Sequence, residues 1–507
     1  MEICSSNSIR NMDKDYIEKF NMPSIVLMEN AIIKFLENID LTKESFTIIS
    51  GRGNNGGDAL GIARHLLNKG KKVYVHILEK EKEGLLEKEK EGSVDYKTNL
   101  TILEKLGCYI KGISNNKDLE ILKNNIINSE ILIDGIFGTG LNKEISGIYF
   151  ETIKCINENS KFTFSIDVPS GINSDDGSIC EIAVKANETI SFQVYKLGFL
   201  NYKSFEYLGD LKIVDIGIPK SIVYKNSDNM RFTDREYIRN KFPYRNKYGH
   251  KGTYGRSLIF AGHKGFIGAA YMVGQAAIKT GAGLVTVFTH KDVQSELSIK
   301  LNEGMTGTYN SKEEYEEFIG GANVIAFGPG MGNNDLTFEV LNNICNLYSG
   351  TLVIDADGIN VLERKKSILK EFKGDIVLTP HPGEMARLLG IEIKDVERDR
   401  IGIAKDFAKE NGITVLLKGY NTIITDGDKV FVNPTGNSAM ASGGMGDTLT
   451  GIITSLTSQG VNSFDAAILG AYIHGYIGDE LSKENFTVSA MEIIKNIPNK
   501  IKELISF

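Results

Sequence analysis

Short apolar runs that end in glycine or a polar residue recur along this chain, and stretches with helical periodicity follow them. In the first half, SFTIIS (45–50) leads into GRGNNGG and then into DALGIARHLLNKG, which predicts a helix ending at Gly70. The next apolar run is KVYVHIL (72–78). This alternation predicts parallel strands joined by helices that cover both faces of a sheet. In such sheets ligands bind beyond the carboxyl ends of the strands, so we expect the functional loops there.

The alternation starts again in the second half, after a polar connection at 219–230. There RSLIFAG (256–262) predicts a strand that runs into a glycine loop. The loop motifs of the two halves differ, so the chain does not repeat itself. We therefore expect two three-layer α/β domains, at 1–218 and 231–507, joined by a linker at 219–230. Five further strands are expected in the second domain: GLVTVFT (283–289), ANVIAFG (322–328), TLVIDADG (351–358), DIVLTPHPGE (375–384) and ITVLLKG (413–419).

Length, charge and cysteine content exclude several classes of protein. A chain of 507 residues is too long for one core, and its net charge of −7 argues against a nucleic-acid binder, which needs a basic face. The five cysteines are scattered without a CxxC pair, so we expect neither a zinc site nor a disulfide framework, and a reduced cytoplasm fits. No run of about 18 apolar residues predicts a membrane span, and the N-terminus lacks the apolar core of a signal peptide. The charged run EKEKEGLLEKEKEG (79–92) predicts a solvated helix or loop.

Three loops of the first half follow predicted strands and carry polar tips. They are GNNGGD (53–58), DGIFGTGLNKE (134–144) and SIDVPSG (165–171). Asn, Asp and Ser oxygens together suit a hard cation, and Asp167 at a strand end is a candidate general acid or base. Asp134 and Asp167 could instead only cap turns and helices. Because three such loops fall at corresponding strand ends, we favour a binding site.

These loops carry a resemblance that extends over nearly all of residues 9–200. Five segments together resemble the NAD(P)H-hydrate epimerase family. They are RNMDKDYIEKFNMPSIVLMENA (10–31), GRGNNGGDALGIARHL (51–66), IDGIFGTGL (133–141), SIDVPSGINSDDG (165–177) and ETISFQVYKLGF (188–199). The resemblance implies a Rossmann-like fold and bound potassium. It also implies interconversion of the two epimers of hydrated NADH or NADPH (NADHX and NADPHX), in which water has added across the nicotinamide ring.

The same resemblance assigns roles to individual residues. Asp167 would be the acid or base. Potassium would be held by Asn55, Asp134 and Ser170. The implied substrate-binding residues, besides Asp167, are Asn54, Asn55, Gly56, Gly57, Asp58, Gly138, Thr139, Gly140, Leu141, Asn142, Lys143 and Glu144.

A glycine-rich stretch near the C-terminus, NPTGNSAMASGGMGDTLTGI (433–452), opens an apolar helical run. One face of this run carries Leu449, Ile452, Ile453 and Leu456. Amides at a helix N-terminus can bind an anion, and Asp447 in the first turn can take a proton from a hydroxyl. The stretch could also be an ordinary helix cap. Together with LLKGYNT (416–422) it resembles the ribokinase-like superfamily, whose small-molecule kinases use such a loop as anion hole and base.

A second loop separates kinases from related lyases. Vitamin kinases of that superfamily carry TPN..E, in which the Glu helps to position magnesium, whereas this chain has TPHPGE (379–384) with His381 in place of Asn. With GPGMG (328–332) and GHKGFIGAA (262–270), residues 245–485 resemble the ADP/ATP-dependent NAD(P)H-hydrate dehydratase family. Alone, His381 could be a strand-end histidine that makes a backbone hydrogen bond. Inside TPHPGE we favour a substrate contact.

The dehydratase resemblance implies that ADP, with ATP as an alternative, phosphorylates the hydroxyl, which then leaves as phosphate. Asp447 would deprotonate the hydroxyl, the amides from Gly443 to Gly446 would hold the phosphoryl group, and Glu384 would help to hold magnesium. No GxxxxGK[ST] sequence occurs, so this is not a P-loop enzyme. The implied nucleotide-binding residues are Lys418, Gly419, Tyr420, Asn421, Thr422, Gly443, Gly444 and Gly446. The implied hydrate-binding residues are Ala269, Gly330, His381 and Asp447.

Together the halves predict one bifunctional nucleotide-repair enzyme, with a Rossmann-like first domain and a ribokinase-like second domain. The first would interconvert the epimers, and the second would dehydrate the S epimer at the expense of ADP, giving AMP and phosphate. We expect a cytoplasmic homo-oligomer whose partners are these small molecules and neither nucleic acid nor membranes. Two alternatives stay open at this point: a metabolite kinase with a non-catalytic first half, and a first half that serves only as a scaffold.

Overall fold

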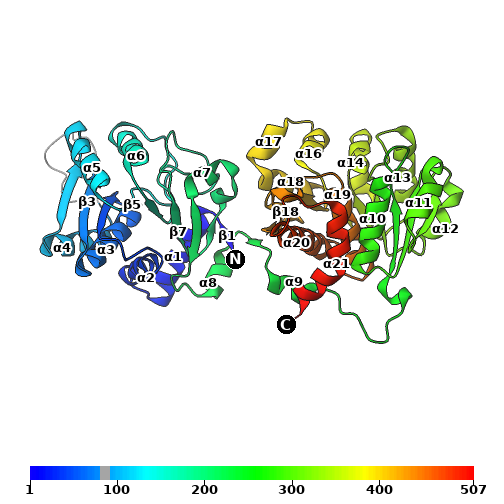
Figure 1. Cartoon of the computed structure of the whole chain (residues 1–507), viewed down its shortest axis with the longest axis horizontal. Coiled ribbons are helices and arrows are strands. Elements are labelled where there is room, and N and C mark those ends of the chain that lie inside the picture. Colours follow the sequence, from blue (N-terminus) through cyan, green and yellow to red (C-terminus); the bar gives the residue numbers. More distant parts are fainter. Residues whose placement is uncertain (80–91, 507) are drawn as a thin grey trace. The chain divides into compact units, whose positions relative to one another are not determined.

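The computed structural model describes residues 1–79 and 92–506 and divides the chain into two compact units, Met1–Asp228 and Asn229–Phe507 (Figure 1). The solvated helix or loop expected at 79–92 lies, apart from its two end residues, outside the described residues. Among the helices that are described, none is long and apolar enough to cross a membrane.

The first unit is built on a sheet of seven strands that all pair in parallel. The strands are β2 (Ser45–Ser50), β3 (Lys72–Leu78), β4 (Tyr109–Ile113), β5 (Ile131–Gly135), β6 (Thr163–Ile166), β7 (Glu188–Phe192) and β9 (Asp210–Val214). Their order in space is β4, β3, β2, β5, β6, β7 and β9. The chain therefore runs outward in one direction from β2 and in the other from β5. Such a reversal leaves a crevice between the carboxyl ends of β2 and β5.

Helices cover both faces of this sheet (Figure 1). Along β2, Ile48 is buried in a core with α2 and α3, whereas Ile49 is buried in a second core with α5 and α6, as the alternation of side chains requires. The helices are α1 (Ser6–Phe20), α2 (Ser24–Leu36), α3 (Asn54–Asn68), α4 (Val94–Lys105), α5 (Asn116–Asn128) and α6 (Gly147–Asn159). Since α3 begins at Asn54, residues predicted as a turn after β2 form its first turn.

The second unit is built on a sheet of ten strands. They are β10 (Met230–Phe232), β11 (Arg256–Phe260), β12 (Leu284–Thr289), β13 (Met305–Thr308), β14 (Val324–Phe327), β15 (Thr351–Ile354), β16 (Ile376–Leu378), β17 (Thr414–Leu417), β18 (Thr422–Thr425) and β19 (Val430–Asn433). In space the order is β10, β19, β18, β17, β16, β15, β14, β11, β12 and β13, and only β18 runs antiparallel to its neighbours. The order reverses between β11 and β14, which places a second crevice there.

One core of the second unit joins the sheet to α10 (Ile267–Thr280), α19 (Met445–Ser458), α20 (Ser463–Ser482) and α21 (Ala490–Ile505). The predicted apolar face of α19 is buried in it: Leu449, Ile452, Ile453 and Leu456. Outside this core, α18 (Arg400–Asn411) packs against β17 and β18. The prediction of an α/β fold with mostly parallel sheets is therefore confirmed.

Residues 219–230, expected to be a linker, contain α8 (Lys220–Asn226) and the start of β10. Two side chains of α8, Ile222 and Val223, are buried in the core of the first unit. The segment is polar overall, but this apolar pair ties it to the sheet. The first unit consequently extends to Asp228.

Candidate active sites

A cavity of about 700 Å³ opens in the first unit at the crevice between β2 and β5. Predicted residues that line it are Asn54, Asn55, Asp58, Gly138, Thr139, Gly140, Leu141, Asn142, Lys143 and Asp167. Gly56 and Gly57 are buried inside α3, where a Cβ on Gly56 would lie 2.1 Å from the Gly51 carbonyl oxygen. Only glycine lets the helix pack this closely on the loop. Glu144 is exposed next to Lys143.

Asp134, at the end of β5, is fully buried next to the cavity loops. Its carboxylate accepts hydrogen bonds from the hydroxyl of Ser170 at 2.6 Å and from the amide of Ser170 at 2.9 Å. Two more donors are the Ser165 hydroxyl and the Ile136 amide. The Asn55 side-chain amide donates to the carbonyl of Phe137 at 2.8 Å, and the Phe137 amide donates to Ser170. The loop at Phe137 thus brings Asn55, Asp134 and Ser170 together.

Asp167 follows β6 and faces the cavity with a strained backbone, because its φ of 63° lies in the left-handed region. Its Oδ1 lies 2.5 Å from the Nζ of Lys196, a side chain that is almost completely buried. The Lys196 ammonium also donates to the carbonyl of Phe192 at 2.8 Å, and the Phe192 amide donates to Asp167 at 3.0 Å. A positive charge is therefore fixed beside the candidate acid or base.

Five charged residues line this cavity without having been predicted: Arg10, Asp13, Arg52, Asp95 and Lys196. Pairing of β1 (Ile3–Cys4) with β8 (Tyr195–Lys196) brings the start of the chain to Lys196 and so places α1 at the cavity. All except Asp95 lie inside motifs that carry the family resemblance. The charged side chains inside those motifs could have identified these residues from the sequence.

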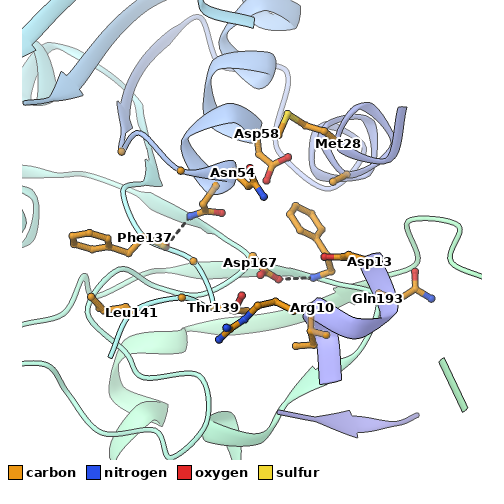
Figure 2. A pocket seen from close by; sticks show the side chains of 18 of the residues that line it. Arg10, Asp13, Met28, Asn54, Asp58, Phe137, Thr139, Leu141, Asp167 and Gln193 are labelled. Atoms are coloured by element: carbon orange, nitrogen blue, oxygen red, sulfur yellow. Dashed lines mark hydrogen bonds between the residues drawn. The ribbon is translucent and has the colours of Figure 1, made fainter. Parts of the chain in front are cut away.

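Carboxylates gather in this cavity, where Asp13, Asp58 and Asp167 face the same space and Asp95 also lines the wall (Figure 2). Burial and the nearby Asp167 raise the pKa of Asp13 to about 6, against the opposing effect of Lys196. Burial and the three other carboxylates raise the pKa of Asp58 well above its usual range, and no described residue donates a hydrogen bond to it. Carboxyl groups with different proton affinities in one cavity can give and take protons on one substrate.

In the second unit the glycine-rich loop opens α19, which begins at Met445. Gly444 precedes the helix with a φ of 87°, and Gly443 is exposed. Asp447 lies partly buried in the first turn. Burial and the nearby Asp355 raise the pKa of Asp447 to about 6, and Lys418 opposes this increase. The candidate base therefore lies at a helix end whose amides can bind an anion, and its pKa is close to neutrality.

Lys418 directly follows β17 and joins two predicted loops. Its amide donates to the carbonyl of Pro380 at 2.8 Å, and its Nζ lies 2.8 Å from Oδ1 of Asp355. Arg400 supports the loop by donating to the Tyr420 carbonyl at 2.7 Å. The remaining predicted nucleotide residues of this loop are Gly419 and Asn421, both with positive φ, and Thr422, whose hydroxyl donates to the Gly419 carbonyl.

His381 and Glu384 form a capping box at the start of α16 (Pro382–Leu389). The Nδ1 of His381 accepts from the amides of Gly383 and Glu384, so the backbone hydrogen bond considered as the alternative is present. The histidine side chain is nevertheless half exposed, and its other ring nitrogen, Nε2, lies 3.4 Å from Oε1 of Glu384. Burial and the Lys418 ammonium lower the pKa of His381, which favours the neutral ring.

Glu384, which was expected to help to hold magnesium, faces a lysine. It is buried, its Oε2 accepts the amide of His381 at 2.8 Å, and the Lys418 ammonium lies 3.8 Å away. A lysine facing the carboxylate repels a divalent cation. In the described parts of the chain no three His, Cys, Asp or Glu side chains form a group that could hold a metal.

The predicted hydrate-binding residues Ala269 and Gly330 lie at the crevice between β11 and β14. A Cβ on Gly330 would lie 2.9 Å from the Cβ of Ala269. A small cavity of about 190 Å³ adjoins these loops and is lined by His263, Lys264, His290, Tyr309, Met331, Asn334 and Leu336. Asp357 accepts a hydrogen bond from the Gly332 amide at 2.7 Å and contributes to the raised pKa of Asp447.

Asp355 is the main residue of this site that was not predicted. It directly follows β15, is fully buried, and accepts a hydrogen bond from the hydroxyl of Thr450 on α19. Its position at a strand end in TLVIDADG could have identified Asp355 as a candidate from the sequence. Its pairing with Lys418 depends on contacts between distant segments, which the sequence does not show.

Fold and sites together define a two-domain α/β enzyme with a separate carboxylate-centred site in each domain. Residues 257–499 match the family described as NAD(P)H-hydrate dehydratase, and residues 24–198 match the family described as YjeF-related protein N-terminus. The chain belongs to the family of bifunctional NAD(P)H-hydrate repair enzymes, with an epimerase and a dehydratase domain.

Bifunctional enzymes from other organisms match over most of the chain. The bifunctional NAD(P)H-hydrate repair enzyme of Moorella thermoacetica is 34% identical over 96% of this chain and 93% of its own. The enzyme of the same description from Coxiella burnetii is 33% identical over 87% of this chain and 86% of its own. A solved ribokinase-like superfamily protein from Enterococcus faecalis is 27% identical, covers 54% of this chain and 96% of its own, and has a TM-score of 0.51. These matches argue against a kinase with a non-catalytic first half.

Proposed function

We propose that the cavity at Asp167 is where the epimers interconvert and that the site at Asp447 dehydrates the S epimer with ADP. One observation carries this assignment. Asp447 lies in the first turn of α19, beside Lys418, with a pKa raised to about 6. Transfer of a phosphoryl group to a hydroxyl needs a base at a site that binds anions, and this helix start combines both properties.

In the epimerase cavity we assign proton transfer to two carboxylates. Hydration places the hydroxyl on the carbon bonded to the ring nitrogen. Asp167 takes the hydroxyl proton as the carbon–nitrogen bond breaks to give an aldehyde, and Asp13 gives a proton to the departing nitrogen. Closure on the opposite face reverses both transfers, so no atom is gained or lost. The raised pKa of Asp13 supports its role as the acid.

Potassium fits the oxygen-rich site near this cavity. Asp134 is a buried carboxylate whose pKa is raised by burial, and among residues 1–79 and 92–506 no lysine or arginine pairs with it. Oxygens of Asn55, Asp134 and Ser170 would hold the ion, which would supply a fixed positive charge beneath the substrate loops. The protein's own contribution is the hydrogen-bond network that keeps these oxygens together.

In the dehydratase site we assign two steps. Asp447 takes the proton of the substrate hydroxyl while the hydroxyl oxygen attacks the terminal phosphorus of ADP. The bond from that phosphorus to AMP then breaks. The carbon–oxygen bond then breaks, phosphate leaves with its electron pair, and loss of a proton from the neighbouring carbon restores the ring double bond. The products are the reduced nucleotide, AMP and phosphate. Amides at the start of α19 hold the phosphoryl group during transfer.

Two isosteric variants test these assignments. Asp447→Asn removes the base, so we expect dehydration of the S epimer to fall about 100-fold or more. Asp167→Asn should leave dehydration of the S epimer unchanged and slow consumption of the R epimer. Reduced-nicotinamide absorbance measures both, and each variant is the control for the other. An Asp447→Asn enzyme with full activity would overturn the assignment of the base.

A further inference from the structure

Two carboxylates hold the ammonium of Lys418, and a hydroxyl from a third segment holds one of them. It lies 2.8 Å from Oδ1 of Asp355, at the end of β15, and 3.8 Å from Oε2 of Glu384 in α16. The other oxygen of Asp355 accepts the hydroxyl of Thr450 on α19 at 2.7 Å. Asp355 is fully buried, and both of its carboxylate oxygens have partners. One of these oxygens orients the lysine.

This ammonium lies against the first turn of α19. A Cβ added to Gly446 would be 3.4 Å from Nζ of Lys418 and 3.8 Å from Oδ2 of Asp355. The lysine charge and the free amides of the helix N-terminus consequently face the same place, where both attract an anion. Glu384 cannot replace Asp355 in this task, because Glu384 already caps α16 and lies farther from Nζ.

We propose that Asp355, held by the Thr450 hydroxyl, is a positioning residue that fixes Lys418 as a protein-supplied cation for the transferring phosphoryl group. The inference rests on the phosphoryl-transfer step proposed above. Negative charge on the oxygens of the transferring group meets an ammonium whose direction is already set, so no reorganisation is needed during the reaction. A lysine held in this way acts mainly on the transition state, and its loss lowers kcat more than it changes KM.

Substitutions of two threonines on one helix test this inference. Thr450→Val removes one of the two threonine hydroxyls that hydrogen-bond Asp355, the other being that of Thr379, and Thr450→Ser keeps it. Thr454→Val is the matched control, because the buried Thr454 hydroxyl donates only to the Thr450 carbonyl within α19. We expect Thr450→Val to lower kcat for the S epimer about tenfold with little change in KM for ADP. Thr450→Ser should retain most of the wild-type kcat, and Thr454→Val should match the wild type.

Equal kcat values for Thr450→Val and Thr454→Val would overturn the inference. So would a Thr450→Ser enzyme as slow as Thr450→Val, since the methyl group and not the hydroxyl would then matter. Thermal unfolding of all three variants separates a loss of fold from a loss of rate. A wild-type chain that releases no AMP and phosphate from ADP while dehydrating the hydrate would overturn the proposed phosphoryl transfer and this inference together. A wild type that does release them leaves the valine comparison as a test of the inference alone.

Discussion

Asp13, Asp58 and Asp447 all bind their protons more tightly than carboxyl groups in water, and burial is the largest cause for each. Perturbed carboxyl groups in a cleft are typical of catalytic sites. Asp134, whose pKa burial also raises, and Asp355 are buried as well, but their oxygens are occupied by hydrogen bonds or an ion pair. At the scale of single residues the distinction is therefore between carboxylates that hold the site together and carboxylates that exchange protons.

The pKa of Asp447 sets a pH dependence for dehydration. A base acts in its ionised form, so kcat for the S epimer should fall tenfold per pH unit below about 6, where Asp447 becomes protonated. Asp355→Asn removes a negative charge that raises this pKa, so its acid limb should move to lower pH. Profiles of kcat from pH 5 to 8 for the wild type and the variant measure the position of the acid limb in each enzyme. A limb caused by titration of ADP itself would lie at the same pH in both. An acid limb at the same pH in both enzymes would contradict the role of Asp447.

Asp58 predicts a pH-dependent stability. Its folded-state pKa is raised, so below about pH 4 both the folded and the unfolded state hold the proton and ionisation costs the fold nothing. As pH rises, the unfolded state ionises first and the fold loses stability. Asp58→Asn avoids this loss and should melt at higher temperature than the wild type near pH 8, with the difference vanishing near pH 4. Melting temperatures that differ by the same amount at every pH would contradict this explanation.

At the scale of elements, the start of α19 depends on two adjacent glycines with different surroundings. Gly444 has a φ of 87°, and a Cβ there would lie 2.4 Å from Sδ of Met272 on α10. Gly443 has no atom within 4 Å of an added Cβ. The loop therefore requires glycine for conformation at one position and tolerates a side chain at the other.

Alanine substitutions at these two positions test whether the loop needs the positive φ of Gly444 or only small residues. Gly444→Ala should destabilise the second unit by about 1–2 kcal/mol and lower the dehydration rate, because alanine disfavours the left-handed region. Gly443→Ala is the control and should change neither. Denaturant unfolding together with kcat for the S epimer measures the effects. Equal stability of the two variants would show that the positive φ of Gly444 is not needed.

At the scale of the whole molecule, the alternation of apolar runs and helices was sufficient to predict two α/β units and the loops at their strand ends. It did not predict that α8 belongs to the first unit, because the apolar pair Ile222 and Val223 is hidden in a polar stretch. Nor did it predict Lys196 beside Asp167 or Asp355 beside Lys418. Those pairs form only when segments far apart in the sequence meet, and local patterns do not encode such contacts.

The most direct test of a chain with two cooperating activities is the time course of reduced-nicotinamide absorbance on racemic hydrated NADH with ADP, magnesium and potassium. The wild-type chain should return all of the hydrate to NADH at a rate well above that of spontaneous epimerisation. The Asp167→Asn chain should convert the S epimer quickly and the R epimer only at the spontaneous rate. A wild-type time course with the same slow second phase as Asp167→Asn, or no recovery with either ADP or ATP, would contradict the central claim.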